Sequence, residues 1–379
     1  MKLLALLCLA LLIPAAAEAR LTAAEQRMVA TVDKEQARSI ALLEKLVNQN
    51  SGSLNLPGVE AVGQMMRAEL EPLGFAVRWV PMKETGRAGH IVATHKGNGR
   101  GKKMLLIGHL DTVFEPDSPF QRFTRKSETE AEGPGIGDDK GGMVVMVAAL
   151  RAMQAAGTLK HADIEIVLTG DEEDNGLPIE IARGDLIAAG KRADVALDFE
   201  GLSQQDGRDM GAIARRSSGG WEVRATGRTG HSSGIFSTNS GNGAIYELSR
   251  IIAAFRSELP EPNLTFNVGL IAGGTTAPLD ADRIPATATG KTNIIPEIAI
   301  ARGDIRTLSG EQDARVRAKM QEIVGRHLPG TSAEIRFDPD TYPPMAPTEG
   351  NKALLARLNG VNRDMGLPEM EAIDPLRRG

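Results

Sequence analysis

The sequence has almost no cysteine. Its single cysteine, Cys8, lies in an apolar N-terminal segment, so the rest of the chain contains no thiol. Disulfides, thiolate metal ligands and a cysteine nucleophile are therefore excluded from residue 20 onward. A metal site in that part of the chain has to be built from histidine, aspartate and glutamate side chains.

A large excess of one charge is also missing. The chain has 44 lysines and arginines against 49 aspartates and glutamates, which gives a formal net charge of -5. This balance provides no basic face for nucleic acid, so we expect no nucleic-acid partner. The length of 379 residues is too great for one compact core and predicts two domains.

The N-terminal segment has the pattern of a secretory signal peptide. Lys2 precedes an apolar run over residues 3–13, and the small-residue motif AEA follows at residues 17–19. We predict a signal peptide over residues 1–19, with cleavage before Arg20 and a secreted or periplasmic mature protein. The apolar run is too short to span a membrane, and we expect no membrane partner for the mature form. The alternative, a buried helix, lacks an amphipathic pattern.

Residues 20–210 predict the first part of an α/β catalytic domain. Thr22 and Glu25 form a capping box that opens a helical region to about Val47. The segments KKMLLIGHLDT, ADIEIVLTG and ADVALDFEG read as buried strands, and DKGGMVVMVAALRAMQAAG between the first two reads as a helix. Strands that alternate with helices in this order favour a mostly parallel sheet.

The pattern changes near residue 211. The segment WEVRATG alternates between apolar and polar residues, and apolar residues from Ala244 to Phe255 recur at helical spacing. Two further strand-like segments and a helix over about 310–327 follow. We predict an inserted α+β domain with an antiparallel sheet over residues 211–328, after which residues 329–379 return to the first domain.

Acidic residues and one histidine occur at four successive strand ends or adjoining loops. In open α/β sheets, ligands bind beyond the carboxyl ends of the strands, so these groups are expected to converge. Carboxylates with an imidazole suit Zn²⁺ or a similar divalent ion, and bound cations would make the acidic run over residues 171–174 tolerable. The groups are His109 with Asp111, Asp138 with Asp139, Glu172 with Glu173, and Glu200.

Two of these segments allow other interpretations. The run GDEEDNG could be a solvated acidic loop, and as an EF-hand loop it fails because Ala182 would stand at the twelfth position. The segment GHSSG matches the nucleophile motif of serine hydrolases, with Ser232 as the nucleophile. The residues that follow Ser232 read as loop rather than helix, and His327 is the only downstream histidine, so this alternative is disfavoured.

The motifs GHLDTVF, GPGIGDDKGG, TGDEEDNG and DFEG, in this order and spacing, are similar to those of the M20 metallopeptidases, in particular their glutamate carboxypeptidase branch. The resemblance continues through TGRTGHSSG and TNIIPEIAIARGDIR and covers about residues 30–340. It implies a zinc-exopeptidase-like catalytic domain with two zinc ions per subunit. It also implies an inserted dimerisation (lid) domain through which a homodimer forms.

The resemblance implies a role for each metal-site residue. His109 ligates one zinc, with Asp111 behind it fixing the imidazole. Asp138 bridges both ions and follows the family in having a cis peptide bond to Asp139. Glu173 completes one metal site and Glu200 completes the other.

The resemblance also implies the chemistry. Glu172 acts as the general base, His231 from the partner subunit stabilises the oxyanion, and Asn293 and Arg306 hold the substrate carboxylate. The expected reaction is hydrolysis of the amide bond of a C-terminal amino acid, with glutamate as one candidate. The substrate would be a small peptide or an N-acyl amino acid.

The sequence departs from the family in one respect. Family members supply a last histidine ligand from a C-terminal segment, and no histidine follows His327 in this chain. The second zinc site is therefore expected to be incomplete, with about one tightly bound zinc. The alternative function is a truncated relative that binds metal or peptide without turnover.

Overall fold

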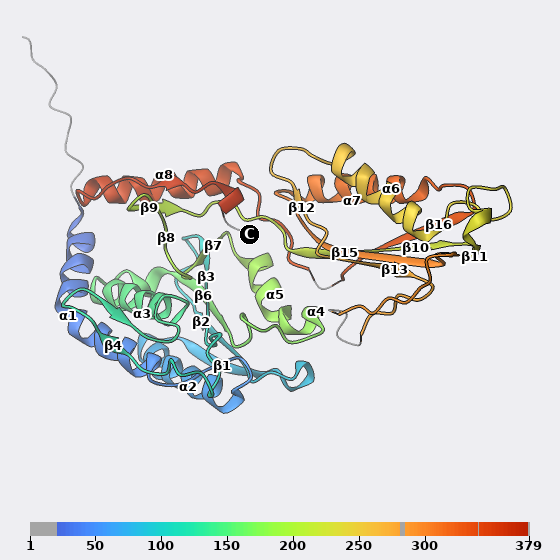
Figure 1. Cartoon of the computed structure of the whole chain (residues 1–379). Coiled ribbons are helices and arrows are strands. Elements are labelled where there is room, and N and C mark those ends of the chain that lie inside the picture. The colour runs from blue at the N-terminus through green and yellow to red at the C-terminus, as the bar shows by residue number, and fades with distance from the viewer. Residues whose placement is uncertain (1–20, 281–284, 340, 378–379) are drawn as a thin grey trace, which may run out of the picture.

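The computed structural model describes residues 21–280, 285–339 and 341–377. It forms two domains that lie side by side (Figure 1). The predicted signal peptide, residues 1–19, lies outside the described residues. Among the residues that are described, no helix has both the length and the apolar character needed to cross a membrane.

The catalytic domain is built on a five-stranded sheet with the order β1-β2-β6-β3-β7. The pairs β6–β3 and β3–β7 are parallel, whereas β1–β2 and β2–β6 are antiparallel, so the sheet is mixed with a parallel half. The α/β class predicted from the sequence is thereby confirmed. The strands are β1 (Ala76–Pro81), β2 (Gly89–His95), β3 (Lys103–His109), β6 (Asp163–Thr169) and β7 (Val195–Asp198).

Helices cover both faces of this sheet. One face packs in a large apolar core against α1 (Ala23–Val47), α2 (Leu56–Leu70) and α3 (Lys140–Ala155). A smaller core on the other face includes Ala189 of α5 (Gly184–Arg192), which follows the short helix α4 (Ile179–Ala182). The capping box predicted at Thr22 is present, because its hydroxyl accepts a hydrogen bond from the Glu25 N–H, and the Glu25 carboxylate accepts one from the Thr22 N–H.

The second domain, called the lid below, is an antiparallel sheet covered on one face by two helices (Figure 1). The helices are α6 (Ala244–Glu258) and α7 (Gly310–Gly325), and the Trp221 ring meets the Phe255 ring edge-on beneath α6. Strand order is β12-β15-β10-β16, with β13 also paired to β15. The bounds are β10 (Gly219–Gly227), β12 (Thr265–Phe266), β13 (Leu270–Gly274), β15 (Ile298–Arg306) and β16 (Thr331–Phe337).

The lid ends later than the sequence predicted. Strand β16 pairs with β10 along its whole length, for example Ile335 opposite Val223, so the lid includes residues up to Phe337 rather than stopping at 328. Residues 331–337 alternate in burial, as an antiparallel strand with one covered face does. The predicted boundary was placed at the end of the preceding helix and missed this strand.

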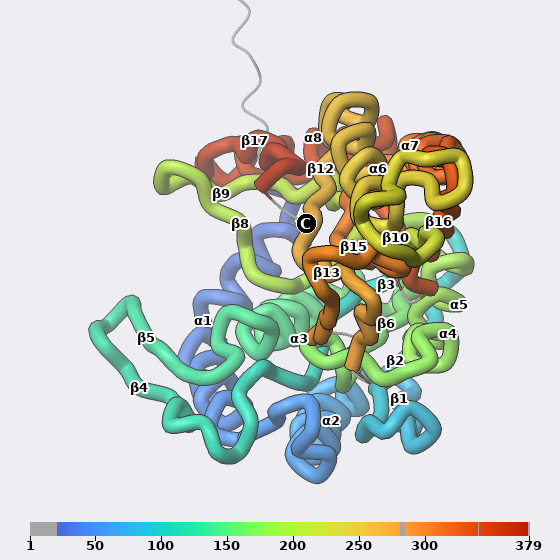
Figure 2. The backbone as a smooth tube through the Cα atoms, turned by 45° about the vertical axis from the view of Figure 1, so that its right-hand side comes forward, coloured from blue at the N-terminus to red at the C-terminus, as the bar shows by residue number. Residues whose placement is uncertain are grey.

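The last part of the chain returns to the catalytic domain. Helix α8 (Glu349–Asp364) lies beside a small sheet of β8 (Ser203–Gln205), β9 (Arg208–Gly211) and β17 (Glu371–Ala372), as Figures 1 and 2 both show. Short paired strands complete the fold: β4 (Thr124–Arg125) with β5 (Ala131–Glu132), and β11 (Gly230–His231) with β14 (Ile294–Ile295).

Candidate active site

The site forms where β3 and β6 end side by side. His109, the last residue of β3, lies opposite Thr169, the last residue of β6, in the parallel register. The loop after β6 therefore starts next to the imidazole. Asp138 reaches the same place from the loop before α3, because α3 packs on β3.

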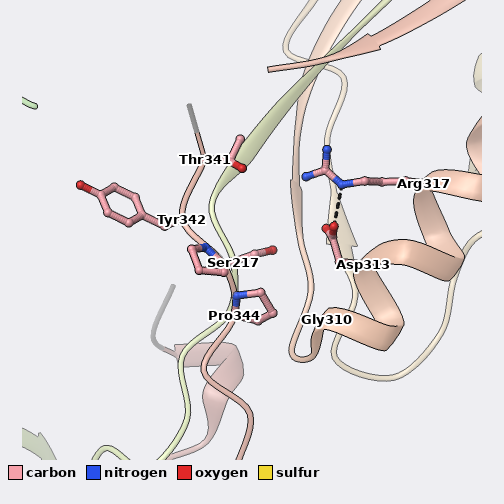
Figure 3. A pocket seen from close by; sticks show the side chains of 8 residues that line it. Ser217, Gly310, Asp313, Arg317, Thr341, Tyr342 and Pro344 are labelled. Carbon is pink, nitrogen blue, oxygen red and sulfur yellow. Dashed lines mark hydrogen bonds and ion pairs between the residues drawn. The ribbon is translucent and has the colours of Figure 1, made fainter. Parts of the chain in front are cut away.

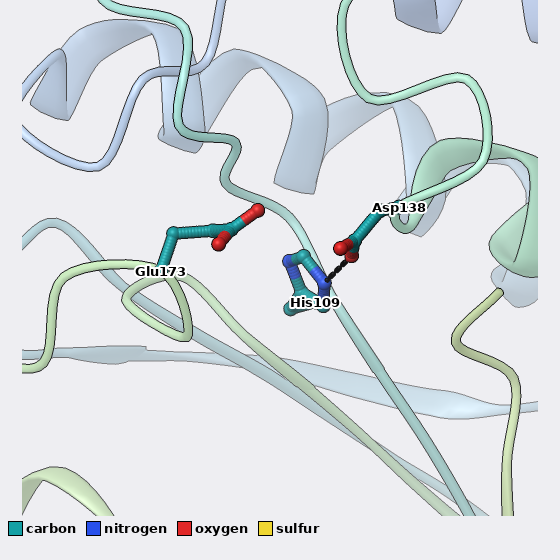
Figure 4. Close-up of side chains that lie close together, drawn as sticks. All are labelled: His109, Asp138 and Glu173. Carbon is teal, nitrogen blue, oxygen red and sulfur yellow. Dashed lines mark hydrogen bonds and ion pairs between the residues drawn. The ribbon is translucent and has the colours of Figure 1, made fainter. Parts of the chain in front are cut away.

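His109, Asp138 and Glu173 form the cluster expected from the sequence. One ligand atom from each lies within 4.8 Å of the others, and His109 Nε2 is 2.7 Å from an Asp138 carboxylate oxygen. Figure 4 shows the two carboxylates extending toward the imidazole from different loops. One nitrogen and two oxygen ligands are a donor set that suits zinc, so the residues present fit the metal that the sequence predicts.

Asp111 organises the site from behind. It is fully buried. Its backbone carbonyl lies 3.1 Å from His109 Nδ1 and its carboxylate lies 3.4 Å from the same nitrogen, which leaves Nε2 facing the cluster. The two carboxylate oxygens also accept the backbone N–H groups of Glu172 and Glu173, each at 3.0 Å. One residue thus contacts both the imidazole and the acidic loop.

Ser53 was not predicted as a site residue, and Asp139 was predicted only as one of the converging acidic residues, with no role of its own. The buried Ser53 hydroxyl donates to Asp111 at 2.6 Å. The buried Asp139 carboxylate accepts the His109 N–H at 3.0 Å, and a side chain at Gly108 would lie 2.5 Å from that carboxylate, so glycine is required there. The peptide bond between Asp138 and Asp139 is cis, as the resemblance predicts.

Two aspartates of the acidic run after β6 are neutralised by arginine side chains. Asp171 is fully buried and paired with Arg183, and Asp174 is paired with Arg87 at 2.8 Å. The sequence predicted bound cations along the whole run, and for these two aspartates that prediction was wrong. No sequence pattern marks Arg183, which lies twelve positions after its partner.

The two glutamates of the run, Glu172 and Glu173, have raised pKa values. Burial raises the pKa of Glu173 to about 7, and the charge of Asp138 adds to the effect. Burial also raises the pKa of Glu172 above its usual value, against the opposing influence of His109. A carboxylate whose pKa is raised accepts a proton more readily and can return it, which a general base has to do.

Glu200 lies apart from the three-residue cluster. It follows β7, and an Arg215 nitrogen lies 3.8 Å from its carboxylate. Its charge helps to raise the pKa of Glu172, so the two carboxylates are close enough to interact. The assignment of Glu200 as a ligand of a second ion stays a prediction.

His231 and Asn293 lie away from this cluster within one protomer. His231 is in β11, which Figure 1 places at the end of the lid farthest from the catalytic domain. Asn293 is beside it, since its carbonyl accepts the Ser232 N–H at 2.9 Å. Arg306 is the last residue of β15, and its guanidinium donates a hydrogen bond to the Asp304 carboxylate at 3.3 Å.

The His231 ring has a defined proton position. The backbone N–H of Ser233 donates to Nδ1 at 3.2 Å, and the Ser233 hydroxyl is 2.8 Å from the same nitrogen. Because a backbone N–H can only donate, Nδ1 is unprotonated and the neutral ring carries its proton on Nε2. The serine hydrolase alternative fails its structural test, because Ser232 begins a three-residue 3-10 helix rather than a strand–turn–helix elbow.

A pH dependence follows from the pKa shifts at the cluster. Burial opposes protonation of His109, but hydrogen bonds to Asp111 and Asp138 outweigh it and raise the pKa of His109 to about 11. The raised pKa of Glu173, about 7, acts in the same direction. The folded protein then binds more protons than the unfolded chain, so its stability falls as pH rises through these ranges.

We expect the thermal stability of chelator-treated protein to fall as the pH is raised from about 5 to about 9. Added zinc should restore stability most at the higher pH, because metal ligands bind in their deprotonated forms. Thermal unfolding midpoints with and without zinc provide the measurement. A midpoint that rises with pH in the chelator-treated protein would contradict the assigned protonation.

Comparison with known proteins gives matches to both domains. Residues 213–332 match the peptidase dimerisation domain of the M20 class, and residues 90–204 match peptidase family M28. Carboxypeptidase G2 of a Pseudomonas species is 29% identical over 304 residues, which cover 79% of this chain and 68% of that protein. Succinyl-diaminopimelate desuccinylase of Novosphingobium aromaticivorans is 29% identical over 299 residues, covering 76% and 73%.

A further relative and two solved structures extend these matches. Acetylornithine deacetylase of Proteus mirabilis is 30% identical over 279 residues, covering 69% of this chain and 66% of that protein. Aminopeptidase PepT of Bacillus cereus superposes with a TM-score of 0.65 at 18% identity, covering 89% and 84%. A dinuclear metal-binding peptidase of family M20 from Bacillus subtilis gives 0.57 at 17% identity, covering 90% and 83%. At these identities the two structures show a shared fold.

Proposed function

Because the chain belongs to the M20 family of metallopeptidases, we propose that it hydrolyses the amide bond between a C-terminal amino acid and a small peptide or N-acyl group. The observation that carries the proposal is the cluster of His109, Asp138 and Glu173 with Glu172 held next to it by Asp111. Relatives named as a carboxypeptidase, a desuccinylase and a deacetylase support this reaction class.

We assign the proton transfers to Glu172. Its backbone is fixed by Asp111, and its raised pKa suits a group that takes a proton from the attacking water and passes it to the leaving amine. Zinc held by the cluster would polarise the scissile carbonyl and lower the pKa of water. We propose that His109, Asp138 and Glu173 would hold one tightly bound zinc per subunit, and that Glu200 would be a ligand of a second, more weakly bound ion.

The substrate carboxylate and the oxyanion are assigned to the lid. His231 presents an Nε2–H donor, which suits a developing negative charge on oxygen. Its place at the far end of the lid supports a homodimer in which His231 and Asn293 act in the partner's site. Arg306 would hold the substrate carboxylate. Within the proposed substrate class, a C-terminal glutamate is to be tested first, because the motifs resemble those of the glutamate carboxypeptidase branch.

The proposal is tested by metal-dependent turnover. Purified protein is assayed on N-acyl glutamate, N-acyl leucine and glutamyl dipeptides before chelation, after chelation, and after zinc is returned. We expect hydrolysis that chelation abolishes and zinc restores. Turnover that survives complete removal of metal would refute a metallopeptidase mechanism, and so would the absence of hydrolysis across the panel in zinc-loaded protein.

The dimer is tested at the open edge of the lid sheet. Ile271 in β13 is 58% exposed, and Ile245 at the start of α6 is close to the same strand. We expect Ile271→Asp to give a monomer in sedimentation experiments, because a charge at an apolar interface is costly to bury. Activity should fall by about 10²–10³-fold, the effect of losing an oxyanion donor.

Ile187→Asp is the matched control for the dimer test, since Ile187 is 48% exposed on α5 of the catalytic domain. It should remain a dimer with normal turnover. A monomeric Ile271→Asp protein with normal turnover would exclude the shared site.

We also propose that the protein is exported. Support comes from the pattern of residues 1–19, with a short apolar run and the AEA motif at 17–19. The full-length chain is expressed in a bacterium and the N-terminus of the exported product is sequenced. Export should yield a chain that begins at Arg20, and retention of an intact N-terminus in the cytoplasm would reject the proposal.

A further inference from the structure

Two connecting segments, residues 211–218 and 341–345, lie between the lid and the catalytic domain. They run antiparallel and bond to each other at two points within the residues described. Ser218 and Tyr342 exchange two backbone hydrogen bonds, at 3.1 and 3.0 Å, and Arg215 and Met345 do the same at 3.0 and 2.9 Å. A movement of the lid therefore acts on both segments together.

Tyr342 reaches from this connection into the catalytic domain. Its backbone borders a cavity of about 190 Å³ against the start of α7, but its ring points away from Arg317 and Asp313 of that helix (Figure 3). The Tyr342 hydroxyl donates to the side-chain carbonyl of Asn175 at 2.7 Å. Asn175 lies in the loop after β6, two residues beyond Glu173.

The same Asn175 carbonyl also accepts a hydrogen bond from Arg183. Arg183 in turn donates to the side chain of Asp171 and to its backbone carbonyl at 2.9 Å. The Asp171 carboxylate accepts the Gly176 N–H at 3.0 Å, which closes the loop on itself. Asp171 and Arg183 are buried, so this clamp is shielded from water.

Glu172 and Glu173 are thus held between two anchors. Asp111 binds their backbone N–H groups on one side, and the clamp of Asp171, Arg183 and Asn175 fixes the loop on the other. Tyr342 ties this clamp to the lid connection. Burial raises the pKa of Tyr342 above its ordinary value, so the hydroxyl stays protonated and able to donate.

We propose that Tyr342 is a positioning residue, which holds the Asp171–Gly176 loop through Asn175 and so transmits the orientation of the lid to Glu172 and Glu173. The proposal deepens the proposed function and rests on it for the roles of the two glutamates. Arg215 in the other connector lies 3.8 Å from Glu200, so each connector contacts a residue near the cluster, Asn175 in one case and Glu200 in the other.

The test uses Tyr342→Phe, which removes the hydroxyl and keeps the ring, together with Asn175→Ala and the double variant in the full-length protein. We expect kcat to fall about five- to tenfold in each single variant with KM little changed, because one hydrogen bond that positions the base is lost. The double variant should fall no further than Asn175→Ala alone, since that change already removes the Tyr342 contact together with the bond from Arg183.

Hydrogen exchange of the metal-free protein gives a readout that is independent of turnover. Peptides that cover residues 170–178 should exchange faster in Tyr342→Phe than in the wild type. Asn359→Ala is the matched control, because the Asn359 side chain on α8 makes two hydrogen bonds with the backbone of Met370, at 2.9 and 2.8 Å. It should loosen its own segment and leave residues 170–178 and kcat unchanged.

Each outcome decides the proposal. Faster loop exchange with lower kcat supports it. Unchanged exchange of the loop, or faster exchange with normal kcat, overturns it, and a lower kcat without faster exchange would make Tyr342 a direct participant instead. Absence of hydrolysis by the wild type would defeat the proposed function, while the exchange measurement would still decide whether Tyr342 holds the loop.

Discussion

Glu172→Gln is expected to lower kcat by about 10²–10⁴-fold while zinc content stays near that of the wild type. Glutamine keeps the shape of the side chain but cannot take a proton from water. Glu172 is outside the metal cluster, whereas its neighbour Glu173 belongs to it. Glu173→Gln should therefore lose bound zinc and activity together. Metal analysis and turnover of the two purified variants give the measurement.

Asp174→Asn is the control for this comparison, because Asp174 belongs to the same acidic run but pairs with Arg87. It should keep both zinc and turnover. The division of roles is wrong if Glu172→Gln empties the metal site, or if the two glutamate variants behave alike. It is also wrong if Asp174→Asn is as inactive as Glu172→Gln.

Asp111→Asn should reduce zinc affinity about 10–100-fold, the usual cost of disturbing the group that orients a metal-ligating histidine. Asparagine has one carbonyl oxygen in place of two carboxylate oxygens. It cannot accept from both Glu172 N–H and Glu173 N–H, and its amide would oppose one of these donors. The unpaired buried donor should also lower the free energy of unfolding by about 1–3 kcal/mol.

A pair of serine variants provides the companion test for Asp111. Ser53→Ala removes the hydroxyl that donates to Asp111 at 2.6 Å and should weaken zinc binding in the same direction. Ser51 is equally buried two residues earlier, and its hydroxyl has no hydrogen-bond partner among the described residues. Ser51→Ala should leave zinc affinity unchanged. Equal effects of the two serine variants would exclude a specific role for the Ser53 contact.

The metal cluster was predictable because its signals are local. His109 ends a buried strand, Asp138 precedes a helix and Glu173 follows another buried strand, and strand ends in a parallel pair must lie side by side. The place of Asp111 behind His109 was predicted from the resemblance to the M20 metallopeptidases. Its two bonds to the loop after β6 were not, because they depend on how that loop folds back.

The contacts made by Arg183 and Tyr342 had no local signal. Arg183 satisfies Asp171 only because the loop turns back on itself, and Tyr342 meets Asn175 from 167 positions away. Strand β16 was missed because the predicted boundary was placed at the end of the preceding helix, although the pairing of β16 with β10 places it in the lid. In each case the partner is set by tertiary packing rather than by neighbouring residues.

The insertion of the lid has a consequence for the order in which the protein can form during synthesis. The five strands of the catalytic sheet lie between residues 76 and 198, and the lid has its own apolar core from Trp221 to Phe337. Each is one contiguous stretch of chain, and domains generally fold as units while the ribosome extends the chain. A nascent chain of about 210 residues already contains His109, Asp138 and Glu173, so metal capture can precede completion of the lid. The link through Tyr342 can form only after the lid has been synthesised and the chain has returned.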